Sequence, residues 1–324
     1  MAGMGRTGSA LAVLGGGTLL AAQSRANGTL ASAMGDPFAT AIWSIGSGWV
    51  LLCLAFLDPR ARAVLPRLRR AHRGGELAWW MFLGGLVGGI LVTTQAYAVP
   101  IAGVALVLIC IVAGQTLSAL WVDHAGFGPG GPKPVSRGRV VAASATLIGV
   151  AVAVGPRIGV GGARVVLPAL LALGVGALLA VQTATNGRVN VVGGNPFVTT
   201  WINFSWGLLV VVVAGGVHAL ATGSGMPTRF DAPWWAWTGG VLGVIYVAIN
   251  AVAVRRIGVL YVMLLAITGQ LAGALALDLL DPVQRAHVGA GTVAGVAITL
   301  AACLAAGLSS RLRAQSGAAS AGAR

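Results

Sequence analysis

The chain is 324 residues long, 57% hydrophobic and only 9% charged, with a mean hydropathy of +0.88. Soluble domains carry about 25% charged residues, so this composition excludes an ordinary soluble enzyme, and the apolar content excludes a disordered chain. The net charge of +14 would indicate a nucleic-acid partner in a soluble protein. In the class that remains, a polytopic membrane protein, basic residues on the loops report topology instead.

Ten apolar stretches are long enough, or nearly so, to cross the bilayer as helices. We predict transmembrane helices, in chain order, at 10–31, 38–57, 79–99, 102–122, 139–156, 165–187, 197–219, 234–254, 258–279 and 288–308. Two pairs of these helices are joined by tight links, at Pro100–Gly103 and Arg255–Gly258. The first stretch follows Arg6 and ends in small residues, which is also typical of a signal peptide.

An internal repeat decides that question and divides the chain into two halves. ALAVLGGGTLLAAQSRANG at 10–28 corresponds to ALLALGVGALLAVQTATNG at 169–187, and GDPFAT at 35–40 corresponds to GNPFVT at 194–199, both with an offset of 159 residues. Further along, Trp79-Trp80 corresponds to Trp234-Trp235, and Gly114-Gln115 to Gly269-Gln270, with an offset of 155. Because a copy in the middle of a chain cannot be a signal peptide, the first stretch is a retained helix.

We therefore predict an all-α integral membrane protein with ten transmembrane helices, arranged as two five-helix repeats. The expected segments are a cytoplasmic tail at 1–9, a first repeat at 10–156, a linker at 157–164, a second repeat at 165–310 and a disordered tail at 311–324. With the N-terminus in the cytoplasm, 16 Lys and Arg residues fall inside and five outside, which favours both termini inside. Since each half has an odd number of helices, the halves must be inverted, an architecture that transporters use around a midplane site.

Polar side chains inside a membrane are costly, so they indicate function. Eight Gln and Asn residues form four repeat-related pairs, which are Gln23 with Gln182, Asn27 with Asn186, Gln95 with Asn250, and Gln115 with Gln270. Gln23 and Asn27 are four residues apart, so they lie on one helix face, as do their partners. We expect the eight amides to bind substrate in a central cavity; the alternative is that they hydrogen-bond between helices as structural contacts.

The acidic residues and one arginine allow two readings each. Asp123 and Asp278 occupy equivalent helix ends, where they could couple a proton or gate the two entrances, or could pair with basic residues or face headgroup water. Arg25 has Ala184 as its repeat partner, and it could contact an anionic substrate or extend to the outer interface. The Arg-rich loop 58–75 is a candidate for contact with anionic lipids.

The sequence carries no enzyme signature. It has no HExxH, GxSxG or P-loop motif, and its four His residues have no partners at metal-binding spacing. The three Cys residues lie far apart in apolar stretches, without disulfide or zinc spacing. We expect no cofactor, no metal and no nucleic-acid partner, and as partners only the bilayer and a small-molecule substrate.

The repeated motifs resemble one known family. LAAQSRANG followed by GDPFATAIWSIGSG, its copy LAVQTATNG followed by GNPFVTTWINFSWG, and the WWMFLGGLVGG and WWAWTGGVLGVIYV segments are similar to the YdcZ family of the drug/metabolite transporter superfamily, which is EamA-like. The resemblance covers almost the whole chain. It implies a ten-helix carrier of the bacterial inner membrane, usually an exporter of small metabolites or drugs, and it names no substrate. Arg25 departs from the family pattern, which usually has an apolar or small residue there.

These observations favour a secondary transporter that works by alternating access. The alternative is a membrane scaffold or anchor that uses the basic loop 58–75 to hold partners.

Overall fold

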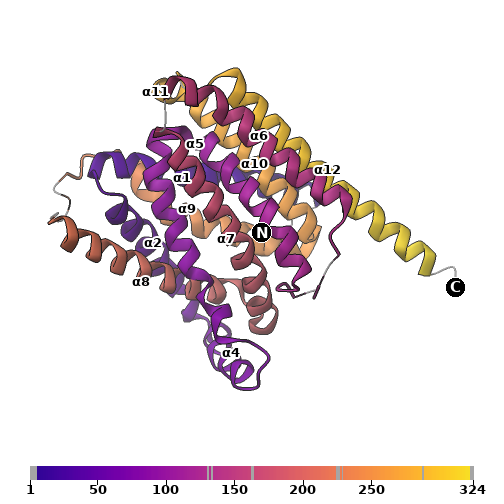
Figure 1. Ribbon diagram of the computed structural model, residues 1–324. Helices are drawn as coiled ribbons and strands as arrows, with labels where there is room; N and C mark the ends of the chain where they lie inside the picture. The colour runs from indigo at the N-terminus through magenta and orange to yellow at the C-terminus, as the bar shows by residue number, and fades with distance from the viewer. Residues whose placement is uncertain are drawn as a thin grey trace.

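The computed structural model describes residues 6–129, 131–132, 134–161, 164–223, 227, 229–286 and 288–321. Within these ranges the chain is helical and contains no strand. Helices pack side by side along much of their length (Figure 1). In chain order the helices are α1 (Arg6–Met34), α2 (Pro37–Cys53), η1 (Leu54–Leu57), α3 (Pro59–Arg62), α4 (Val64–Arg73), η2 (Trp79–Gly84), α5 (Gly85–His124), α6 (Arg137–Gly161), α7 (Val166–Gly193), α8 (Pro196–Thr222), η4 (Trp234–Thr238), α9 (Gly239–Ile257), α10 (Val259–Leu280), α11 (Pro282–Arg285) and α12 (Ala290–Ala321).

Seven helical segments of the described chain are long and apolar enough to cross a membrane. The prediction of ten differs in three places. The segment Trp79–His124 counts as one helix although two were predicted there, the apolar part of α12 is short at Ala290–Ala305, and α1 is not among the seven. A multi-pass membrane protein is therefore clear, whereas the ten-helix count and the inverted halves stay predictions.

Two glycines interrupt the helical backbone at repeat-related positions. Gly103 lies inside α5 with φ 76° and ψ 162°, and Gly258 separates α9 from α10 with φ 81° and ψ 160°. Backbone of this kind is open almost only to glycine. The two breaks fall in the tight links expected from the sequence, and they have nearly the same geometry in both halves.

The packing of the helices follows the repeat. α1 packs on α9 and α10, and its copy α7 packs on α5, while α2 packs on its own copy α8 and α6 on α12. The last pair runs side by side along one flank of the bundle (Figure 1). The centre is the second part of α5, where every residue from Val104 to Ala113 is buried. The buried cluster around α5 therefore contains residues of both halves.

Glycines set the closest helix crossings. A Cβ added at Gly17 of α1 would lie 2.2 Å from the Ala266 carbonyl oxygen of α10, and one at the equivalent Gly176 would lie 2.1 Å from the Ile111 oxygen of α5. Small residues let membrane helices approach closely and gain van der Waals contact. The same crossing is therefore built twice, each time between a helix of one repeat and a helix of the other.

The repeated GDPF and GNPF motifs are helix starts. Asp36 Oδ1 accepts the backbone N–H groups of Phe38 and Ala39 at 2.8 and 3.1 Å, and Asn195 Oδ1 accepts those of Phe197 and Val198. Each cap is followed by a proline at the first helical position, where the missing N–H costs nothing. These motifs fix the tight turns before α2 and α8.

Segment boundaries differ from the sequence expectation at several ends. The Arg-rich segment 58–75 contains two short helices, α3 and α4, and the buried face of α4 packs against α7. α6 extends to Gly161, which lies within the expected linker 157–164, and α12 runs to Ala321, through most of the tail for which disorder is predicted. Residues 1–5, 162–163 and 322–324 lie outside the described residues.

Candidate functional site

Gln23 and Asn27 of α1 lie against glycines of α9. A Cβ added at Gly243 would meet Gln23 Nε2 at 2.9 Å, and one at Gly239 would meet Asn27 Oδ1 at 2.3 Å. The Gln23 and Asn27 side chains are 8% and 0% exposed. The absence of side chains on these glycines is what leaves space for the two amides between α1 and α9.

Ser44 of α2 completes this group, which we call the first amide cluster (Gln23, Asn27 and Ser44). Its hydroxyl also lies beside Gly239, where an added Cβ would meet Ser44 Oγ at 2.9 Å. Both polar atoms of the Asn27 amide and the Ser44 hydroxyl are buried without a hydrogen-bond partner among the described residues. Buried polar groups normally have partners, because leaving one unpaired costs about 1–3 kcal/mol. The first amide cluster therefore has spare hydrogen-bonding capacity for water or a bound solute.

The other half contains the second amide cluster (Gln182, Asn186 and Asn203). Cβ atoms added at Gly84 would meet Asn186 Oδ1 at 3.1 Å and Asn203 Oδ1 at 3.2 Å, and the nearest atom to one at Gly88 would be Gln182 Nε2 at 3.7 Å. All three side chains are only partly buried. The two clusters thus use equivalent positions, but the first is closed and tight and the second is looser and more exposed.

The remaining four amides lie in different surroundings. Gln95 and Gln270 are buried, Gln115 and Asn250 are partly buried, and the Asn250 amide donates to the Tyr246 carbonyl oxygen of its own helix at 2.7 Å. Gln115 and Gln270 directly follow Gly114 and Gly269, two glycines that lie at close helix crossings. A cavity of about 340 Å³ at the α1–α2 turn is lined by Asp36, Phe38, Tyr97 and His218 among others, and by none of the eight amides. A shared central cavity stays a prediction.

Asp278, at the end of α10, holds the backbone where α5 is interrupted. Its Oδ1 accepts the N–H of Val104 at 3.0 Å and its Oδ2 accepts the N–H of Ala105 at 2.8 Å, and the side chain is 1% exposed. The carboxylate thus satisfies two backbone donors at the start of a new helix, as an N-cap residue does. It lies at the α11 end of the bundle, far along the structure from α4 (Figure 1).

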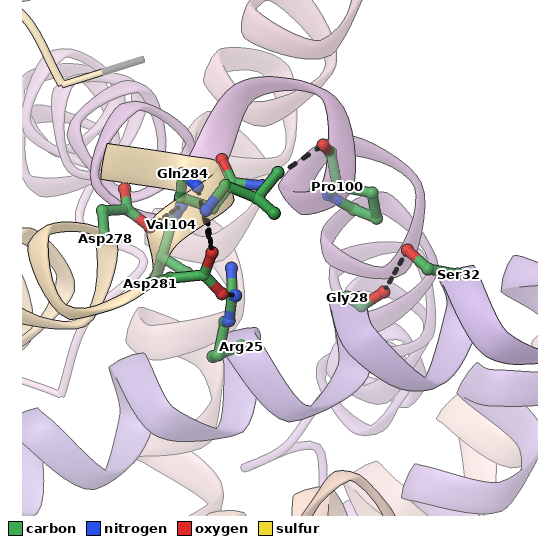
Figure 2. A network of polar contacts seen from close by, with 9 residues as sticks. Arg25, Gly28, Ser32, Pro100, Val104, Asp278, Asp281 and Gln284 are labelled. Atoms are coloured by element: carbon green, nitrogen blue, oxygen red, sulfur yellow. Dashed lines mark hydrogen bonds and ion pairs between the residues drawn. The ribbon is translucent and has the colours of Figure 1, made fainter. Parts of the chain in front are cut away.

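Asp278 belongs to a wider polar network, seen in Figure 2. Arg25 of α1 points toward Asp281 and forms an ion pair with it. Gln284 of α11 donates to the Pro100 carbonyl oxygen at 3.5 Å, and its own oxygen lies beside Gly103. Arg25 therefore has a carboxylate partner within the protein, while its predicted contact with an anionic substrate stays untested.

Asp123 is the repeat equivalent of Asp278 but has a different partner. Its Oδ2 accepts Arg139 Nη2 of α6 at 2.6 Å, and the Asp123 side chain is 28% exposed. Phe127, one turn further on, packs against Trp80, which itself packs on the cluster containing α4. Asp123 therefore lies at the α4 end of the bundle, opposite Asp278.

Ser44, Asn203 and Asp281 are not among the predicted site residues, whereas Arg25 is, with an anionic substrate or the outer interface as its expected surroundings. Ser44 and Asn203 are also 159 residues apart and are therefore repeat equivalents, but Ser44 is not an amide, so a search for paired Gln and Asn residues does not identify them. Asp281 falls between the predicted helices 258–279 and 288–308, and the sequence does not indicate which helix lies opposite it. Among the described residues, no group of three or more His, Cys, Asp or Glu side chains is placed to hold a metal ion.

Comparison with known proteins gives one match. The family model described as "Putative inner membrane exporter, YdcZ" matches residues 8–152 and again residues 167–305. The two matched segments correspond to the two sequence repeats. No curated protein and no solved structure matches the chain.

Proposed function

The chain belongs to the YdcZ family of the drug/metabolite transporter superfamily, and on this premise we propose that it is a secondary transporter. The expected activity is export of a small polar metabolite or drug-like solute across the bacterial inner membrane, by alternating access between two inverted halves. The observation that carries this proposal is the first amide cluster, whose buried Asn27 and Ser44 groups lack partners among the described residues.

The chemistry of the two clusters supports a substrate that hydrogen-bonds without requiring a charge. Amides and hydroxyls both donate and accept, so they bind polar or zwitterionic groups of several shapes. Neither cluster contains a carboxylate or a basic side chain. The first cluster is more buried than the second. We expect such a difference in an inverted-repeat carrier in one of its two end states, in which the side chains of one half are closed off and those of the other half are accessible.

Transport measurements test this proposal. The medium of deletion and overexpression strains is compared by untargeted metabolite profiling, and the solute that differs is then assayed with purified protein in liposomes. We expect N27A and N186A to reduce transport at least tenfold, since each removes an amide that would contact the solute.

Matched controls separate binding from folding. S32A and T183A remove exposed hydroxyl side chains from the same two helices, α1 and α7. Each of these hydroxyls donates to a backbone carbonyl oxygen of its own helix, four residues earlier. Both variants should transport like the wild type. Normal transport by both N27A and N186A, in well-folded protein, would rule out the amide clusters as the binding site.

The basic residues distinguish this function from the scaffold alternative. Arg69, Arg70 and Arg73 of α4 are exposed, whereas the amide clusters lie inside the bundle. A transporter should keep most of its activity when these arginines become glutamine and lose it when the amides are removed; a scaffold should show the reverse. Reporter fusions at each end of the chain test the predicted cytoplasmic location of both termini.

A further inference from the structure

The two helix breaks and the two aspartates form one repeated arrangement. Gly103 and Gly258 are 155 residues apart, and so are Asp123 and Asp278. Asp278 of the second half caps the helix that restarts after Gly103 in the first half. By the same offset, Asp123 of the first half corresponds to a cap for the helix that restarts after Gly258, at the N–H groups of Val259 and Leu260.

The two members of this arrangement are in different states. Asp278 is 1% exposed and bonded to backbone N–H groups, whereas Asp123 is 28% exposed and bonded to Arg139. The backbone at Gly103 and at Gly258 is nonetheless almost the same, with φ near 80° and ψ near 160°. The helix start after Gly258 is thus shaped to receive a cap, while the equivalent carboxylate is held by an arginine.

Polar contacts around Asp278 connect several helices at the α11 end of the bundle. The Arg25–Asp281 ion pair ties α1 to the segment after α10, and Gln284 ties the same segment to Pro100 just before the break in α5 (Figure 2). A Cβ at Gly103 would lie 2.8 Å from Asp278 Oδ2, so the carboxylate fits the break closely. This end therefore joins α1, α5 and α10 through charged and polar groups.

We propose that Asp278 and Asp123 are reciprocal helix caps that alternate, so that the bundle is closed at the α11 end when Asp278 caps Val104 and Ala105, and closed at the α4 end when Asp123 caps Val259 and Leu260. This deepens the proposed transport function and rests on it. Arg139 forms an ion pair with Asp123 in the first state, and this ion pair is broken in the second state. The structure described here corresponds to the first state.

The energetic reason is that a backbone donor at a helix start is costly to leave unpaired in an apolar environment, so each helix start is stabilised when a carboxylate caps it. Hydrogen bonds to a charged acceptor are stronger than neutral ones, and losing a partner exposes the full desolvation cost of the buried group. Two equivalent caps that compete through a rigid bundle therefore give two discrete states rather than a continuum. The repeat supplies both caps with the same local geometry.

Amide hydrogen exchange tests the proposal on the full chain in lipid nanodiscs, without any substrate. Two single variants, D123N and R139Q, break the same ion pair but should act in opposite directions on the peptide containing Val104 and Ala105. R139Q frees Asp123 to cap α10, so exchange at Val104 and Ala105 should become about tenfold faster. D123N weakens the competing cap, so exchange there should become slower than in the wild type.

The controls and the contrary outcomes are defined in the same experiment. R137Q removes the same charge from an exposed neighbouring residue and should leave exchange at these amides unchanged. If D123N and R139Q change exchange in the same direction, or neither changes it, the ion pair is only structural and the proposal is overturned. A third variant, D278N, should speed exchange at Val104 and Ala105 and slow it at Val259 and Leu260; loss of protection at the first pair alone would also overturn it.

These outcomes are independent of the transport assay. A protein that moves no solute can still show reciprocal exchange, and a working transporter can lack it. Failure of the reciprocal caps and failure of the proposed function are therefore distinguishable.

Discussion

Replacing Gly17 by alanine gives the most direct test of the helix crossings. The added Cβ would lie 2.2 Å from the Ala266 carbonyl oxygen, 0.8 Å inside the 3.0 Å that real Cβ contacts essentially never go below. Since the obstacle is backbone on the facing helix, α1 and α10 must separate. Overpacking of this kind costs about 1–3 kcal/mol.

Gly15 provides a control on the same helix. A Cβ at Gly15 meets nothing within 4 Å. Both glycine-to-alanine changes gain about 0.8–1 kcal/mol of helix propensity, so this gain cancels when G17A is compared with G15A. The difference between the two variants therefore isolates the cost of the steric overlap. The repeat supplies a second comparison, G176A with G174A, at equivalent positions of α7.

The assay is thermal unfolding in detergent, followed by the fraction of protein that stays monodisperse after heating. We expect G17A to melt roughly 2–12 °C below G15A, using about 2–4 °C per kcal/mol. G15A should melt at or above the wild type. If G17A and G15A melt at the same temperature, or G15A is the less stable of the two, α1 and α10 do not cross as described.

Three further predictions concern the ends of helices and the surface. Asn195 caps α8 through two backbone N–H groups, so N195A should lose about 1 kcal/mol of stability while N195D, which keeps the acceptor oxygen, should not, as measured by thermal melting. Arg188 donates to the carbonyl oxygens of Gly126 and Gly128 at 2.6 and 3.2 Å, so R188A should make this loop several-fold more sensitive to limited proteolysis, with R164Q as the control. The exposed arginines of α4 should retain anionic lipid, so the combined change of Arg69, Arg70 and Arg73 to glutamine should lower co-purified anionic lipid without lowering zwitterionic lipid.

The sequence by itself determined the class of protein, the repeat and the positions of most helices. Long apolar stretches are local features that the bilayer thickness constrains directly, so their positions can be predicted from composition alone. The glycine breaks at Gly103 and Gly258 and the helix caps at Asp36 and Asn195 were also within reach, because each depends on a few neighbouring residues. Helix ends and the state of the segment 58–75 were less accurate, since they depend on packing.

Only the tertiary structure decided which side chains meet. Asp278 contacts residues more than 170 positions away, and Asn27 and Ser44 both lie beside Gly239 of the other half. A duplicated sequence is nearly symmetric, so it cannot indicate which copy of a site is closed. That asymmetry, a buried Asp278 and first amide cluster against a partly buried Asp123 and second amide cluster, comes from how two similar halves pack in one conformation.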